Sequence, residues 1–82
     1  MASVAAPAIT HVWVARWETE DDAPEIRLFS TEDGCKRWRQ EIATDNWNTG
    51  EDEPEDAEEA ADRYFEYNEC EYFNHYRETI SN

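Results

Sequence analysis

The chain has 82 residues, a formal net charge of −14 at pH 7 and a pI near 4.2, and aromatic residues make up 13 % of it. Because so large a negative charge repels nucleic acid and anionic membranes, we expect neither as a direct partner. At this length a fold buries only about 60 to 65 % of the unfolded chain's surface, which limits the protein to one small core. The aromatic content nevertheless argues against a disordered chain.

The first third of the chain predicts a short lead and a β-hairpin. Residues 1–8 read as a flexible lead, and residues 9–82 as one compact domain. The segment 9–18 is rich in β-branched and aromatic residues, as is typical of a strand. Since both of its faces carry apolar groups, we expect it to be central, or to have helices on one face and Trp residues partly covering the other. The acidic turn 19–24 joins it to a second strand, residues 25–29, with Ile26 and Leu28 on one face.

Two helices and a last strand complete the predicted order. The first helix covers residues 31–47, with Ser30 or Thr31 as its N-cap. The second runs from about residue 54 to residue 69, although Asp56 and Glu59 form an alternative capping box. Residues 71–80 are again rich in β-formers. The prediction is an α+β domain of order ββααβ, a three-stranded antiparallel sheet with two helices on one face.

The first predicted helix has an apolar and a basic side. Its inward stripe consists of Cys35, Trp38, Ile42 and Asn46, and its outward positions include Lys36, Arg37 and Arg39. These three side chains are the only basic cluster in the chain. They can contact an acid or phosphate from outside, but we favour the alternative that they neutralise part of the protein's own acidic surface.

The most unusual stretch is residues 51–71, which holds eleven acidic side chains and one basic side chain, Arg63. Its second half has an apolar helical pattern, formed by Ala57, Ala60, Ala61, Tyr64 and Phe65. The acids are therefore expected on a folded surface. Along a helix, Glu55 to Glu69 would span about 21 Å at 1.5 Å per residue. This charge density is close to that of the phosphates along one DNA strand, about 3.4 Å apart.

A simpler interpretation is a solvated helix face that provides solubility. Against it, like charges four residues apart destabilise a helix by a few tenths of a kcal/mol per pair. A surface that carries this cost repeatedly suggests that the charge density is itself used.

The sequence offers no convincing metal or catalytic site. His11, Cys35, Cys70 and His75 suit zinc by type but not by spacing. Residues 45–56 have the length of an EF-hand loop, but Trp47 occupies a position that needs an oxygen ligand. We therefore expect no cofactor, no metal, two reduced and semi-buried cysteines, and no enzymatic activity. No apolar run is long enough for a membrane helix, and no signal peptide is evident, so a cytoplasmic location is expected.

Size, charge and the acidic stretches EDDAPE and EDEPEDAEEAADRYFE make the chain resemble small phage-encoded inhibitors of bacterial defence, namely anti-CRISPR proteins and anti-restriction DNA mimics. The resemblance lies in these properties and not in a motif, so it assigns no residue a role. It implies an inhibitor in the bacterial host cell that binds a basic nucleic-acid-binding surface of a nuclease or CRISPR effector complex.

The leading hypothesis is therefore a non-catalytic inhibitor that imitates phosphate charge. The expected partner-binding residues are Asp21, Asp22, Glu55, Asp56, Glu58, Glu59, Asp62, Glu66, Glu69 and Tyr67. Tyr64, Trp47 and Tyr72 are further candidate anchors, with core packing as the alternative for each. A second hypothesis is an acidic adaptor or antitoxin-like module that binds a basic protein away from any nucleic-acid site. A third is a small structural or housekeeping domain whose charge serves solubility alone.

Overall fold

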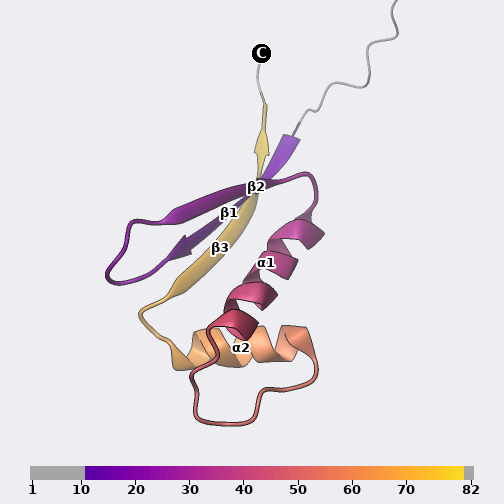
Figure 1. Ribbon diagram of the computed structural model, residues 1–82. Coiled ribbons are helices and arrows are strands. Elements are labelled where there is room, and N and C mark those ends of the chain that lie inside the picture. Colours follow the sequence, from indigo (N-terminus) through magenta and orange to yellow (C-terminus); the bar gives the residue numbers. More distant parts are fainter. Residues whose placement is uncertain (1–10, 81–82) are drawn as a thin grey trace, which may run out of the picture.

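The computed structural model describes residues 11–80, which form a three-stranded sheet and two helices (Figure 1). In chain order the elements are β1 (His11–Glu18), β2 (Glu25–Phe29), α1 (Glu32–Asp45), α2 (Ala57–Tyr67) and β3 (Tyr72–Thr79). The sheet is antiparallel throughout, in the order β2-β1-β3. The predicted α+β class, strand number and element order are confirmed. The predicted lead, residues 1–8, lies outside the described residues.

Pairing in the sheet assigns each strand residue to one of two faces. Ala15 of β1, which is fully buried in the core, lies opposite Arg27 and His75. The next residue, Val14, lies opposite Leu28 and Tyr76, and neighbouring positions along a strand point to opposite faces. The central position expected for this strand is confirmed. The alternative, Trp residues covering a second face, is wrong, because Trp13 and Trp17 share the face of Ala15 and pack against the core.

Trp38 of α1 is the centre of that core. Its ring contacts one aromatic ring from each strand, with centroid distances of 6.4 Å to Trp17, 6.2 Å to Phe29 and 5.4 Å to Phe73. Edge-on and tilted contacts of this kind contribute about 0.5 to 1.5 kcal/mol each beyond the area that they bury. One helical side chain therefore joins all three strands.

The buried stripe of α1 differs from the predicted one at two positions, because Ala43 is also buried and Asn46 is not. Cys35, Trp38 and Ile42 are buried. Asn46 is exposed, and its backbone N–H and side-chain Nδ2 donate to the carbonyl oxygen of Ile42 at 3.1 and 2.8 Å. Asn46 is the C-cap, with a backbone conformation outside the helical range, so the helix ends at Asp45 and not at residue 47.

Gly34 allows the first turn of α1 to approach the sheet. The N-cap is Thr31, whose Oγ1 accepts from the backbone N–H of Gly34 at 3.3 Å. A Cβ atom at position 34 would lie 2.7 Å from Cδ1 of Phe29. Glycine at this position therefore has a packing reason that outweighs its low helix propensity.

The second helix begins later than predicted, at Ala57. Oδ1 of Asp56 accepts from the backbone N–H groups of Glu58 and Glu59 at 2.9 and 3.5 Å, so the alternative start at Asp56 is correct. The helix packs chiefly against α1, with Ala60, Ala61 and Tyr64 buried. It reaches the sheet through Phe65, whose ring lies 6.0 Å from that of Phe73.

The partly buried carboxylate of Glu71 connects three elements of the fold by hydrogen bonds. Glu71, the residue before β3, accepts hydrogen bonds from the indole Nε1–H of Trp17 at 3.0 Å and from the hydroxyl of Tyr64 at 2.9 and 3.0 Å. Hydrogen bonds to an ionised acceptor stabilise by about 1.5 to 3 kcal/mol each. Glu71 thereby links β1, α2 and the start of β3.

The Tyr64 hydroxyl predicts a loss of stability in alkali. Burial, and then the bond to Glu71, raise the pKa of Tyr64 well above its ordinary value near 10. Above pH 10 the unfolded chain releases this proton whereas the folded chain keeps it, so stability falls as pH rises from about 10. Urea unfolding from pH 8 to pH 11 should show a smaller alkaline loss for Tyr64→Phe than for the parent protein. Identical losses would contradict the assignment.

Replacement of Gly34 by Ala should destabilise the protein by about 1 to 3 kcal/mol, because the added methyl group displaces Phe29. Thr44→Ala, at an exposed position of the same helix, is the matched control and should be neutral or stabilising. The measurement is the urea midpoint of both variants. Equal or higher stability for the Gly34 variant would show that Phe29 moves aside freely.

Candidate acidic interaction surface

The acids of residues 51–66 form two adjoining groups, one on the connection before α2 and one on the helix. All of them are exposed, and they are Glu51, Asp52, Glu53, Glu55, Asp56, Glu58, Glu59, Asp62 and Glu66. The predicted single helical stripe from Glu55 to Glu69 is wrong. Helix α2 begins after Glu55 and Asp56 and ends before Glu69. From Glu58 to Glu66 the helical part spans about 12 Å.

Two of the four acids on the helix are ion-paired within the protein. Arg39 of α1 lies 2.9 Å from Asp62, and Arg63 lies 2.8 Å from Glu59. Among the described residues, Glu58 and Glu66 make no ion pair, so they are the helix acids most available to a partner.

The basic triplet neutralises the protein's own acids, as favoured from the sequence. Lys36 lies 3.8 Å from Glu32, and Arg37 lies 3.4 Å from Asp33. Both pairs link residues four apart on an exposed helix and contribute a few tenths of a kcal/mol. Arg39 differs from the predicted outward position, because its guanidinium lies over the Phe65 ring at 5.2 Å and bridges the two helices.

The connection before α2 is held by its own hydrogen bonds. Trp47 Nε1 donates to the carbonyl oxygen of Glu51 at 2.7 Å, and the side-chain amides of Asn48 and Asn68 bond reciprocally at 3.0 Å. Gly50, at φ +81°, makes the turn between these contacts, a backbone conformation that glycine adopts without strain. The acids of residues 51–56 therefore project from a fastened loop.

Tyr67 stands beside this acidic surface. It is 60 % exposed and lines a hollow of about 370 Å³ together with Thr49, Glu51, Arg63 and Glu66. The structure thus brings Tyr67 and Glu66 together, two of the residues predicted to bind a partner. Tyr64 belongs to the core and Trp47 packs against it, so neither is an available anchor.

Asp21 and Asp22 occupy a different place. They are exposed at the tip of the β1–β2 hairpin and line a second hollow, of about 360 Å³, with Glu20, Cys70 and Glu71. The carboxylate of Glu20 raises the pKa of the Cys70 thiol through its charge and a hydrogen bond. The hairpin tip therefore approaches the turn after α2, near Glu69, and lies apart from Glu58 at the other end of that helix.

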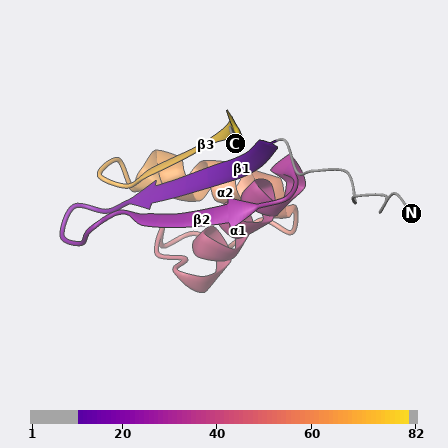
Figure 2. The ribbon, with the colours of Figure 1, turned by 90° about the horizontal axis from the view of Figure 1, so that it is seen from above.

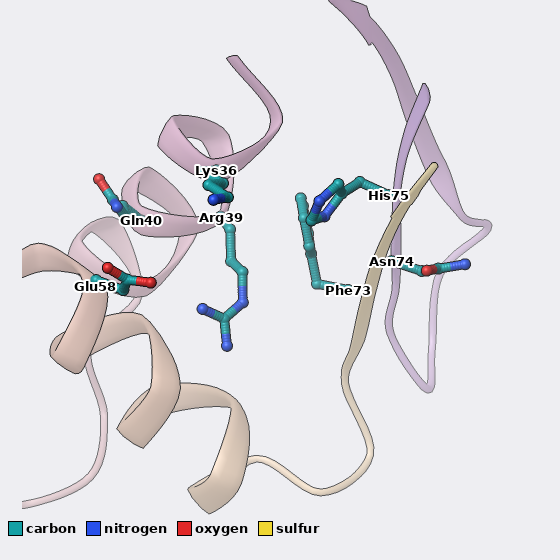
Figure 3. Close-up of a pocket in the computed structure, with 7 residues that line it drawn as sticks. All are labelled: Lys36, Arg39, Gln40, Glu58, Phe73, Asn74 and His75. Atoms are coloured by element: carbon teal, nitrogen blue, oxygen red, sulfur yellow. The ribbon is translucent and has the colours of Figure 1, made fainter. Parts of the chain in front are cut away.

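A third hollow, of about 340 Å³, lies between α1, α2 and β3 (Figure 3). Lys36, Arg39 and Glu58 line it from the helices, and Phe73 and His75 from the strand. Lys36 and His75 both approach Glu32, at 3.8 and 3.4 Å, and Arg39 pairs with Asp62. Because Lys36 and Arg39 each already have a carboxylate neighbour, the hollow is a mixed-charge surface and no ready site for an anion.

The two cysteines differ in their exposure to solvent. Cys35 is buried and Cys70 is exposed, so the expectation of two semi-buried thiols is wrong for both. Burial, and then the charge of Glu32, raise the pKa of Cys35, which keeps this thiol protonated at neutral pH.

In residues 11–80 no three His, Cys, Asp or Glu side chains gather as a metal-binding group. Neither helix of this part is long and apolar enough to cross a membrane.

Sequence reasoning missed the role of Glu71 and treated it as one more displayed acid. The signal was faint, because the residue ends an acidic run and nothing local distinguishes it. Its role depends on Trp17, which is 54 positions away in the chain.

Repulsion among the exposed acids predicts that salt stabilises the protein. The thermal midpoint should rise by a few degrees between about 20 mM and about 500 mM NaCl, since the screening length shortens from about 20 Å to about 4 Å. The variant Asp52→Asn with Glu53→Gln, which removes two exposed charges, should show a smaller rise. A midpoint that stays constant or falls would contradict this expectation.

No family model matches the chain, and neither a curated protein nor a solved structure matches it. The function proposed below is accordingly based on the residues of this chain.

Proposed function

We propose that the protein is a non-catalytic inhibitor that occupies a basic nucleic-acid-binding surface of a bacterial defence complex, such as a nuclease or a CRISPR effector, within the host cytoplasm. The observation that carries the proposal is the unbroken exposure of nine acids between residues 51 and 66 on a fastened loop and the adjoining helix. A rigid acidic surface of this kind complements a groove lined by Lys and Arg.

The charge density supports imitation of phosphate. Five acids fall within residues 51–56, and the four acids of α2, which are Glu58, Glu59, Asp62 and Glu66, are spread over about 12 Å, or about 4 Å of helix axis per interval. Phosphates along one strand of DNA are about 3.4 Å apart, a comparable spacing. Because the loop is fastened by Trp47 and Asp56, less conformational entropy is lost when a partner binds.

Charge alone accelerates association more than it selects a partner, so an anchor is needed. Tyr67 is suited to that role, since it is exposed beside Glu66 and Glu51 at the rim of a hollow. Interface hot spots are enriched in Tyr, which buries a large area with few rotatable bonds. Asp21, Asp22 and Glu69, at the opposite end of α2, make a second contact in this proposal.

The proposal takes both helices to cover the same face of the sheet. The contacts of Trp38 with Trp17 and of Phe65 with Phe73 support this, because Trp17 and Phe73 are paired across β1 and β3. In this arrangement the acids of α2 point away from the sheet and stay accessible.

The second candidate is an acidic adaptor or antitoxin-like module that binds a basic protein outside any nucleic-acid site. One observation favours it, namely the internal pairing of Asp62 with Arg39 and of Glu59 with Arg63, which lowers the free charge on the helix. The two candidates differ in competition. A phosphate mimic is displaced by nucleic acid, whereas an adaptor forms a ternary complex with it.

The test is affinity capture from a bacterial lysate, with the protein as bait and with or without added duplex DNA or RNA. We expect a nuclease or CRISPR complex to be retained only when nucleic acid is absent. The variant Glu53→Gln, Glu58→Gln, Glu66→Gln should lower affinity for the captured complex at least about tenfold and weaken its salt dependence.

The matched control is Glu25→Gln, Asp33→Asn with Glu78→Gln, which also removes three exposed acids, from β2, the first turn of α1 and β3, and should bind as the parent does. Thermal midpoints of both variants verify folding. A partner that binds equally well in the presence of nucleic acid would favour the adaptor, and equal loss in both variants would show that only total charge matters.

A further inference from the structure

A hollow of about 360 Å³ lies where the turn between β1 and β2 meets the turn before β3. Figures 1 and 2 both show these two turns at the same end of the sheet. Glu20, Asp21 and Asp22 line the hollow from the hairpin, and Glu71 lines it from the other turn. Asn46, the C-cap of α1, completes its wall. Three segments that are distant in the sequence thus form one acidic concave surface, which we call the hairpin hollow.

The hairpin hollow differs from the other hollows in its charge. None of the described residues that line it is basic, whereas four are acidic. The hollow beside Tyr67 contains Arg63, and the hollow between the helices and β3 contains Lys36 and Arg39. Those two hollows are therefore partly neutralised by their own side chains. The hairpin hollow instead depends on a cation from outside to balance its charge.

One of its acids, Glu71, is also partly withdrawn from solvent. Its carboxylate accepts hydrogen bonds from the indole N–H of Trp17 and the hydroxyl of Tyr64, which are both neutral donors. Among the described residues it makes no ion pair. A carboxylate that leaves bulk water is usually paired with a cation. The surroundings of Glu71 therefore favour a cation that enters from the hollow.

A hydroxyl group in the same wall has no partner. Thr19 lines the hairpin hollow, and its Oγ1 is buried without a hydrogen-bond partner among residues 11–80. Buried polar atoms are satisfied in the great majority of cases, so an exception needs a reason. This hydroxyl can accept an N–H donor from a molecule in the hollow. It is an observation independent of the acids, and it also indicates a ligand.

We propose that the hairpin hollow binds a linear polyamine, a chain of ammonium groups separated by short methylene segments. No three His, Cys, Asp or Glu side chains of the described residues gather as a metal-binding group. The acids thus do not converge on one point, as a divalent ion requires. Successive ammonium groups of a polyamine can instead reach acids that are spread along the hollow, from Glu71 and Thr19 to Asp21 and Asp22. The proposal does not rest on the proposed function, because it needs no protein target.

The test is a titration of the full, isotope-labelled chain with spermidine, followed by NMR at about 50 mM NaCl. Two indole signals are the reporters, because Trp17 Nε1 donates to Glu71 in the hollow and Trp47 Nε1 donates to Glu51 in the connection before α2. Substitution of each Trp by Phe assigns the signals. Since partial burial strengthens charge interactions, we expect the Trp17 signal to be half-shifted at a spermidine concentration at least about threefold lower than the Trp47 signal.

Asp21→Asn with Asp22→Asn should raise the half-saturating concentration of the reporter in the hollow at least about tenfold. The matched control is Asp52→Asn with Glu53→Gln, which removes two exposed acids elsewhere and should leave that concentration within about twofold. Thr19→Val replaces the hydroxyl by a methyl group of similar size. It should weaken binding at least about threefold, while the urea midpoint stays equal or rises because an unpartnered buried hydroxyl is lost.

Equal half-saturation at the two reporters, or equal weakening by the two charge variants, would show that spermidine responds only to total charge and would overturn the proposal. Unchanged binding by Thr19→Val would overturn it too, because the hollow would then be a bare acidic cluster. Saturation by Mg²⁺ at the same concentrations would indicate a single ion instead of a polyamine. Tighter binding of a tri-lysine peptide would indicate the lysines of a protein partner, and either result overturns the proposal. Loss of target capture with spermidine binding intact would affect only the proposed function.

Discussion

The fold depends on the position of one ring. Trp38 contacts Trp17, Phe29 and Phe73, one from each strand, and the Arg27 guanidinium lies 4.6 Å from its centroid. Only nine of the described residues are buried, and of these four are alanines and two, Trp38 and Tyr64, carry rings. A single large side chain that reaches every strand is therefore an economical means of closing the sheet against α1.

Further contacts reduce the repulsion among the protein's negative charges. Lys36, Arg37 and Arg39 lie on one helix, and each lies close to an acid of this chain. Glu71 is partly withdrawn from solvent and receives donors from Trp17 and Tyr64, so it stabilises the fold instead of adding to the surface charge. Most of the exposed acids of the described residues lie in residues 51–66 and at the hairpin tip, residues 20–22.

This separation produces two surfaces of different chemistry on a very small protein. The acidic surface of the loop and α2 attracts cationic partners over a distance set by ionic strength. The sheet face that carries Val14, Leu28 and Tyr76 holds few charged residues and offers short-range apolar contact.

The sequence by itself determined the class and order of the elements and the bounds of β2. Three local patterns predict the elements, namely strand alternation, the buried stripe of Cys35, Trp38 and Ile42, and the loop residues around Gly50. Each depends only on backbone geometry and on residues that are close in the sequence. For α2 the sequence offered two possible first turns, because Pro54 and Asp56 both suit the beginning of a helix. The hydrogen bonds that Asp56 accepts decided it.

Only the tertiary structure decided which acids are free, which are neutralised and which face of the sheet is covered. The pairs Arg39 with Asp62 and Trp17 with Glu71 join residues 23 and 54 positions apart, so no spacing rule predicts them. Alternation in β2 placed Ile26 and Leu28 on a common face, but it is equally compatible with a buried and an exposed one. The helices settled that choice, because Trp38 packs on the face of Phe29 and leaves Leu28 in solvent.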